Sequence, residues 1–284
     1  WKSSLIIALD KVKNPSTVND FRPIALLCFL SKVIERIASV RIHAYLADSL
    51  ILDPYQTGFR AGNSTQTALL KLTDDIRLGI NGKKLTFLLL FDFSKAFDTV
   101  NHVQLLANLQ RSGFSYSAIT WVASYLTGRS QATLNSQGIP SSFRPLNKGV
   151  PQGSVLGPLL FLLAINDVAL GLPSGVQHLI YADDLQVYYQ FDEKQLADAM
   201  GMMNEAAKHV SQWARNNKLN LNVAKTKELI CGSQAYVNRV YSLSKVGTTI
   251  DDACIPLECS VRNLGVIIDN ELSWREHVMG VSHK

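Results

Sequence analysis

The segment LIYADDLQVYY, residues 179–189, constrains the fold more strongly than any other part of the sequence. Two adjacent carboxylates, Asp183 and Asp184, interrupt apolar and aromatic residues that are otherwise typical of a buried strand. An unpaired ionised group is costly in such a place. Within one continuous strand the two side chains would point to opposite faces of the sheet, whereas a tight hairpin turn exposes both at a sheet edge. We therefore expect a hairpin that carries both aspartates at its turn.

A third carboxylate, Asp92, ends another strand-like segment. The apolar run in KLTFLLLFDF has the length of a strand in a covered sheet. If this strand neighbours the hairpin, three acids converge, and such crowding raises their pKa values unless cations intervene. Oxygen ligands without nearby His or Cys favour Mg²⁺, with Mn²⁺ as a substitute. The alternative is a solvated turn and an unrelated strand end.

The remaining sequence predicts an α+β fold. Apolar residues spaced three or four apart predict helices over residues 29–50, 64–80, 116–127 and 192–217. Further strands are predicted at RSQATLN, KTKELIC and VRNLGVIID, and the segment NKGVPQGSVLGPLLF reads as a Gly/Pro loop that enters an apolar helix. No linker or repeat divides the chain, so we expect one continuous unit with subdomains and a mainly helical first third.

Composition narrows the classes of partner. At 284 residues and 47% hydrophobic side chains the chain can bury a large core, and no apolar run reaches the roughly 18 residues of a membrane span. We expect a soluble, intracellular protein with no membrane partner. Residues 1–90 contain 12 Lys and Arg against 7 Asp and Glu, whereas residues 91–284 contain 16 of each. A basic first third suits a phosphate-rich partner, although an excess this small is more often just a solvated surface.

Seven blocks in order resemble the reverse transcriptases of non-LTR retrotransposons of the Jockey group. They are DFRPIALL, QTGFRAGNSTQTAL, FDFSKAFDTVNH, GVPQGSVLGPLLF, YADD, LNLNVAKTK and VRNLGVIIDNELSW, and the match spans residues 15–276. The resemblance implies a right-hand polymerase with a fingers-like region over residues 1–84, palm with some finger elements over 85–232, and the end of the palm and start of the thumb over 233–284. It also implies an RNA template, a DNA primer, dNTPs and two Mg²⁺ ions.

The same resemblance implies a place and a context for the activity. It places the site of action in the nucleus, and it implies that the parent polyprotein carries an endonuclease domain that this sequence does not contain. The first methionine is Met200, so we expect the chain to be part of a longer polypeptide.

The resemblance assigns roles to individual residues. Asp92, Asp183 and Asp184 align with the catalytic, metal-binding aspartates, with Asp184 the more peripheral of the adjacent pair. Phe97 matches the steric gate that would lie under the sugar of an incoming nucleotide and clash with a 2′-OH, which implies a DNA product. Outside the motif, Phe97 reads as a core aromatic residue, and Asp98 reads as a helix cap.

Four further residues are implied to contact the nucleotide or the leaving group. Gln152 aligns with a residue on the nucleotide and template side, and Gly153 belongs to the same loop, where exposed amides favour phosphate. Arg60 matches a finger arginine that grips the triphosphate, with a surface arginine as the alternative. Lys225 aligns with the lysine that protonates the leaving pyrophosphate, and Lys227 is close enough to be the alternative.

Two other functions remain open at this point. An RNA-dependent RNA polymerase shares the palm, but its hairpin usually reads GDD and it lacks a bulky gate, so a preference for rNTPs would identify it. A catalytically lost or domesticated element fragment would bind nucleic acid without incorporation, and its binding would depend on salt.

Overall fold

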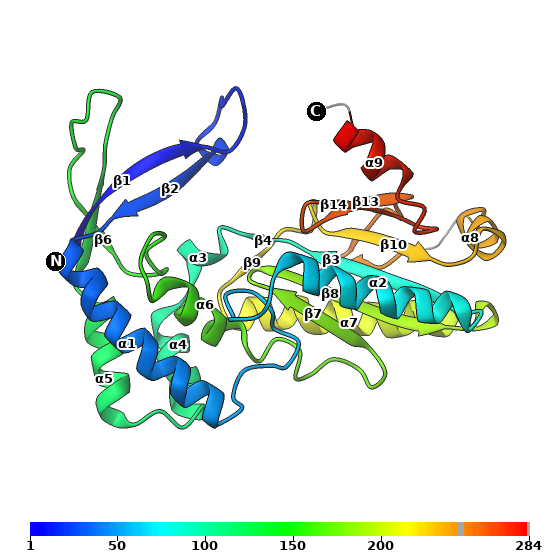
Figure 1. The fold of residues 1–284 in the computed structure, drawn as a ribbon, viewed down its shortest axis with the longest axis horizontal. Helices are drawn as coiled ribbons and strands as arrows, with labels where there is room; N and C mark the ends of the chain where they lie inside the picture. The colour runs from blue at the N-terminus through cyan, green and yellow to red at the C-terminus, as the bar shows by residue number, and fades with distance from the viewer. Residues whose placement is uncertain (244–246, 283–284) are drawn as a thin grey trace. The chain divides into compact units, whose positions relative to one another are not determined.

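The computed structural model describes residues 1–243 and 247–282, and the chain forms two compact units that alternate along the sequence (Figure 1). The first unit comprises Trp1–Asp53, Lys95–Asn166 and Asn217–Leu219. The second unit comprises Pro54–Ser94, Asp167–Asn216 and Asn220–Lys284. The expected subdomain boundaries at residues 84 and 232 stay predictions.

The first unit contains a four-stranded sheet in the order β2-β1-β5-β6. Its strands are β1 (Ser3–Asp10), β2 (Phe21–Leu26), β5 (Arg129–Thr133) and β6 (Arg144–Leu146), and only the β1–β5 pair is parallel. The helices are α1 (Phe29–Asp48), α3 (Ala96–Thr99), α4 (His102–Arg111), α5 (Tyr116–Leu126) and α6 (Gly157–Ile165), with a 3₁₀ turn at Val18–Asp20. The hairpin of β1 and β2 precedes α1, so the first third of the chain has more strand than the sequence pattern indicated.

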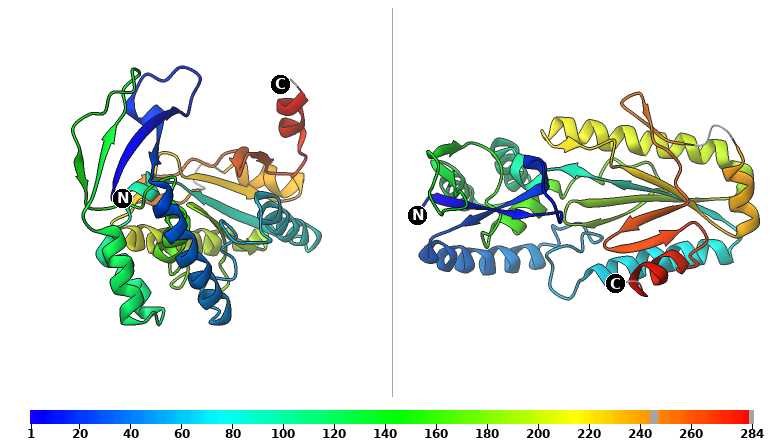
Figure 2. Two further views of the ribbon diagram at one scale, coloured as in Figure 1. Left: turned by 60° about the vertical axis from the view of Figure 1, so that its left-hand side comes forward. Right: turned by 90° about the horizontal axis from the view of Figure 1, so that it is seen from above.

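The second unit is built on an antiparallel sheet in the order β10-β3-β8-β7. Its strands are β3 (Leu85–Phe91), β7 (Gln177–Tyr181), β8 (Asp184–Phe191) and β10 (Lys227–Cys231). Helices α2 (Thr65–Asn81) and α7 (Leu196–Asn216) cover opposite faces of this sheet (Figure 2). The predicted hairpin is therefore present as β7 and β8, and the strand that ends before Asp92 lies directly beside it.

Short elements complete the second unit. They are β4 (Phe93–Ser94) paired with β9 (Asn220–Leu221), β11 (Thr249–Ile250) with β12 (Ala253–Cys254), β13 (Ser260–Asn263) with β14 (Val266–Asp269), a 3₁₀ turn at Glu193–Gln195, α8 (Gln234–Tyr241) and α9 (Arg275–Ser282). No helix within the described ranges is both long enough and apolar enough to span a bilayer.

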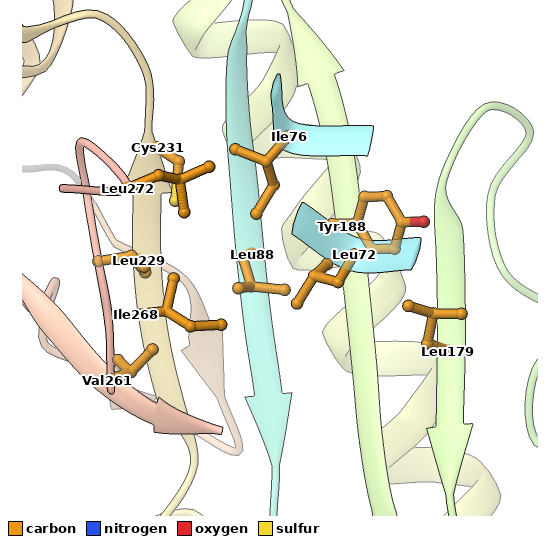
Figure 3. Packing of buried hydrophobic residues seen from close by; sticks show 10 residues of the cluster. All are labelled: Leu72, Ile76, Leu88, Leu179, Tyr188, Leu229, Cys231, Val261, Ile268 and Leu272. Atoms are coloured by element: carbon orange, nitrogen blue, oxygen red, sulfur yellow. The ribbon is translucent and has the colours of Figure 1, made fainter. Parts of the chain in front are cut away.

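One buried cluster of the second unit packs α2 and residues of β13 and β14 against one face of the sheet (Figure 3). Leu72 and Ile76 of α2 belong to the same buried cluster as Leu88 of β3 and Tyr188 of β8, and all four are at most 1% exposed. Leu88 and Tyr188 are opposite each other in the β3–β8 register, so both point to the same face. Burial of each large apolar side chain contributes about 1.5–3 kcal/mol, and this packing in the middle of the strands fixes the register that places the aspartates at one end of the sheet.

Helix α1 has the predicted length but presents its apolar stripe to solvent. Leu30, Val33, Ile37 and Val40 are each more than 40% exposed. The buried face instead contains Ser31, Glu35, Ser39 and Leu46. The orientation of the helix is fixed by Glu35, whose carboxylate accepts hydrogen bonds from the backbone N–H groups of Val155 at 2.7 Å and Leu156 at 3.1 Å, just before α6.

Glu228 makes stability depend on pH. Its side chain is fully buried in β10, where Oε2 accepts a hydrogen bond from Thr248 N at 2.8 Å, and burial raises its pKa from 4.5 to about 7. The unfolded chain loses this proton near pH 4.5 and the folded chain near pH 7, so the stabilisation is complete below pH 4.5 and is lost as pH rises to 7.

The wild type should lose unfolding free energy between pH 4 and pH 8 because Glu228 ionises in this range. We therefore expect this loss to be smaller in Glu228→Gln, by roughly 3 kcal/mol. Urea unfolding at both pH values measures this difference. Glu205→Gln, on the exposed side of α7, is the matched control and should leave the pH dependence unchanged. Equal pH dependence in the wild type and Glu228→Gln would show that Glu228 ionises normally in the fold.

Candidate active site

The three predicted catalytic aspartates converge at one end of the second unit's sheet. Tyr181 pairs with Asp184, which leaves Ala182 and Asp183 as the two-residue turn between β7 and β8. In the neighbouring strand β3, Phe91 pairs with Leu185 of β8. Asp92 follows Phe91 and Asp184 precedes Leu185, so these two aspartates lie at the same end of the antiparallel pair. Long-range pairing of β3 with β8 thus brings together acids that are more than ninety positions apart in the sequence.

The charges of these carboxylates act on one another. The pKa of Asp184 is raised to about 6. The largest cause is partial burial of its carboxylate, and the smaller causes are the negative charges of Asp183 and then Asp92. The Asp184 residue remains exposed, whereas Asp92 and Asp183 are half-buried. A cation bound among them would offset this repulsion and stabilise the ionised form of all three.

The donor chemistry of this end of the sheet fits Mg²⁺ or Mn²⁺. The three side chains offer only hard carboxylate oxygens, which are the ligands these ions prefer. Over residues 1–243 and 247–282, no three His, Cys, Asp or Glu side chains are grouped closely enough to hold a metal ion unaided. Mg²⁺ typically binds one or two carboxylates and completes its coordination with water and substrate phosphates. The carboxylate oxygens at this end of the sheet therefore have the chemistry that such an ion prefers.

Arg60 and the two candidate lysines also belong to the second unit. The guanidinium of Arg60 donates from Nη1 to the carbonyl of Gln56 at 3.0 Å. Lys225 is exposed in the turn between β9 and β10. This turn is hydrogen-bonded to the backbone of Asp92, because Asn222 N donates to the carbonyl of Asp92 at 2.8 Å. Lys227 lies on β10 and forms an ion pair with Glu258 at 2.8 Å. The structure therefore separates the two lysines by their surroundings.

The predicted gate and nucleotide loop belong to the first unit. Phe97 in α3 stacks on Phe161 of α6, with ring centroids 4.2 Å apart and planes at 19°. The loop before α6 is bound to α3 because Val150 N donates to the carbonyl of Phe97 at 2.8 Å. Gly153 has φ +105°, and a Cβ there would lie 2.8 Å from the carbonyl oxygen of Ala25, so this position requires glycine.

Gln152 is held from two sides. Its backbone carbonyl accepts from Ala25 N at 2.7 Å, and its side-chain Nε2 donates to Asp98 Oδ1 at 2.8 Å. Burial raises the pKa of Asp98, while the bond from Gln152 and the charge of Lys95 act in the opposite direction. Asp98 was expected as a helix cap, but its carboxylate instead orients the Gln152 amide. Both side chains line a cavity of about 680 Å³ in the first unit, beside Lys95 and Lys148.

Sequence patterns missed three residues that position these groups. Glu35 anchors the start of α6, Asp98 orients Gln152, and Gln56 contacts the backbone of the YADD turn at Ala182. Gln56 is the first residue of the block QTGFRAGNSTQTAL, in which the family resemblance assigns a role only to Arg60. Glu35 gave no distinguishing signal in the sequence, because Lys32, three positions earlier, makes it look like half of an ordinary exposed i, i+3 charge pair.

Comparison with known proteins identifies the family. Residues 11–268 match the family model for reverse transcriptase, an RNA-dependent DNA polymerase. The chain is 30% identical over 288 residues to a probable RNA-directed DNA polymerase from transposon X-element of Drosophila melanogaster, and 28% identical over 288 residues to the RNA-directed DNA polymerase from mobile element jockey of the same species. Both alignments cover 99% of this chain and 30% of the relative, so the chain spans about 30% of their length.

The fold also matches solved structures. An apo telomerase from Candida tropicalis, truncated from its C-terminal domain, superposes with a TM-score of 0.60 at 12% identity, covering 96% of this chain and 54% of that chain. This similarity supports the expected right-hand polymerase fold. With its family motifs in order and three aspartates gathered at the YADD hairpin, the chain belongs to the reverse transcriptase family and resembles the RNA-directed DNA polymerases of non-LTR retrotransposons.

Proposed function

We propose that this chain is the RNA-directed DNA polymerase core of a non-LTR retrotransposon and adds dNTPs to a DNA primer along an RNA template. The observation that carries the proposal is the convergence of Asp92, Asp183 and Asp184 at one end of a sheet in a member of this family. Divalent-metal dependence is general in the family, and the oxygen-only donor set is consistent with it.

The metal requirement is proposed in more detail as two Mg²⁺ ions. Asp92 and Asp183 would hold both ions and Asp184 would be the more peripheral acid, consistent with its exposure. When bound, the ions would lower the pKa of the attacking primer hydroxyl and stabilise the leaving oxygen. The carboxylates themselves fix the site at the end of a packed sheet, so little reorganisation is required.

The other residues would act on the nucleotide. Arg60 would bind the triphosphate through its planar guanidinium, and Gln152 and Gly153 would line the nucleotide and template side. Phe97, backed by its stack on Phe161, would present a rigid surface to the sugar and select dNTPs over rNTPs. We favour Lys225 over Lys227 as the proton donor to pyrophosphate because Lys227 is already paired with Glu258.

Primer extension by the purified chain tests the proposal. We expect Mg²⁺-dependent incorporation of dNTPs on an RNA template with a DNA primer, and much weaker incorporation of rNTPs. Preferential use of rNTPs would instead identify an RNA polymerase. Salt-dependent template binding without incorporation would identify a fragment that binds nucleic acid only.

A further inference from the structure

The strand-like segment around Gln56 covers the free edge of the hairpin that carries Asp183. Gln56 forms a parallel bridge with Ile180 of β7. Ile180 N donates to the carbonyl of Tyr55 at 3.0 Å, and Thr57 N donates to the carbonyl of Ile180 at 2.8 Å. These bonds fix the segment in register with the last residues before the YADD turn, within the second unit.

The side chain of Gln56 reaches the turn itself. It is fully buried, and its Oε1 accepts hydrogen bonds from Gly58 N at 2.9 Å and from Ala182 N at 3.3 Å. Ala182 has φ +55°, a left-handed conformation that costs a non-glycine residue about 1 kcal/mol or more. A bond to its N–H from a buried amide helps to hold the turn in this conformation, immediately before Asp183.

Gly58 permits this close approach. A Cβ at Gly58 would lie 2.2 Å from Ala182 N and 2.9 Å from its Cα, both backbone atoms that cannot move aside. The backbone of the segment therefore touches the backbone of the turn directly. On its other side Gln56 accepts, through its main-chain carbonyl, the hydrogen bond from Arg60 Nη1 at 3.0 Å.

We propose that Gln56 is a positioning residue that holds the YADD turn through Ala182 and, through its carbonyl, sets Arg60 relative to that turn. One buried residue thus links the carboxylates to the proposed triphosphate-binding guanidinium. The inference rests on the proposed function, since it assigns Gln56 a part in arranging that same site.

Gln56→Met tests the contact directly. Methionine has similar length and no strong acceptor, so the Ala182 amide loses its partner. We expect this amide to exchange with deuterium at least about tenfold faster, in peptides that span residues 179–185, without metal or substrate. Thr57→Val is the matched control, because it removes the 3.1 Å bond from the Thr57 hydroxyl to the Ile180 carbonyl but leaves the Ala182 contact intact. We expect its exchange at Ala182 to stay like the wild type.

Activity then tests the role in positioning. We expect Gln56→Met to lower kcat on the order of 10- to 100-fold and to raise the KM for dNTP, because small displacements of reacting groups are costly. Thr57→Val should retain both within about threefold, and Gln56→Glu, which keeps an acceptor oxygen in place, should recover slow exchange and part of kcat. If Gln56→Met fails to fold, Gln56→Asn replaces it, because the shorter side chain withdraws its oxygen from the Ala182 amide, and the same faster exchange and lower kcat are expected.

Two results would overturn the inference. Unchanged exchange at Ala182 in Gln56→Met would show that the contact does not hold the turn. Faster exchange with wild-type kcat and KM would show that the contact is structural only. A wild-type chain that incorporates no dNTP would refute the proposed function instead, and the exchange measurements would still decide the Gln56 contact.

Discussion

Asp183→Asn is expected to reduce Mg²⁺-dependent dNTP incorporation by at least about 10³-fold. Asparagine keeps the size of the side chain but removes the charge and replaces a carboxylate oxygen with a weaker amide ligand. Metal ions contribute several kcal/mol of transition-state stabilisation, and each 1.36 kcal/mol changes the rate tenfold. Primer extension on an RNA template, under single-turnover conditions, measures the loss.

A second readout separates loss of chemistry from loss of fold. Removal of the Asp183 charge should lower the pKa of Asp184 from about 6, since that charge is the main electrostatic cause of the raised value after burial. NMR titration of the Asp184 carboxyl follows this change. Asp192→Asn, an exposed acid just beyond the other end of β8, is the control and should retain full activity. Normal incorporation by Asp183→Asn would exclude Asp183 as a metal ligand.

Glu35→Ala is expected to destabilise the first unit by about 2–5 kcal/mol. The substitution leaves the N–H groups of Val155 and Leu156 without their acceptor, at a cost of about 1–3 kcal/mol for each buried group. The midpoint of urea unfolding, monitored by fluorescence, measures this loss. Because the same contact holds the loop that contains Gln152, we also expect a higher KM for dNTP.

Two variants identify the cause of this loss. Glu35→Gln retains an oxygen that can accept both bonds, so it should lose less stability than Glu35→Ala. Arg36→Ala lies on the exposed side of the same helix and should change stability by no more than about 0.5 kcal/mol. If Arg36→Ala and Glu35→Ala were equally destabilising, the loss would not come from the hydrogen bonds of Glu35, because alanine itself favours the helix.

The sequence predicted the elements of the site well because those elements are encoded by local patterns. An apolar run that ends at Asp92 requires a covered strand, and two adjacent acids between strand-like segments require a turn. The spans of α1, α2, α5 and α7 follow from the spacing of their apolar residues in the same way. Motif order then indicated the family before any tertiary contact was known.

Periodicity was less informative about which face of an element is buried. Leu30, Val33 and Ile37 form a regular stripe on α1, yet the buried face is the one that carries Glu35. A hydrogen-bonded carboxylate fixes the orientation of this helix, and its partners are backbone amides about 120 residues away. No local sequence pattern predicts such a partner, because every residue except proline offers the same backbone N–H donor.

The sequence by itself predicted a hairpin turn at Asp183 and Asp184, a strand that ends at Asp92, and motifs of a polymerase family; the structure places Asp183 in the turn and Asp184 as the first residue of β8. Only the tertiary structure decided that β3 lies beside β8, and that Gln56 and Asp98 hold the turn and Gln152 in place. The physical reason is range: strand and turn formation depend on neighbours along the chain, whereas sheet order and buried hydrogen bonds depend on groups that meet only when the whole unit packs.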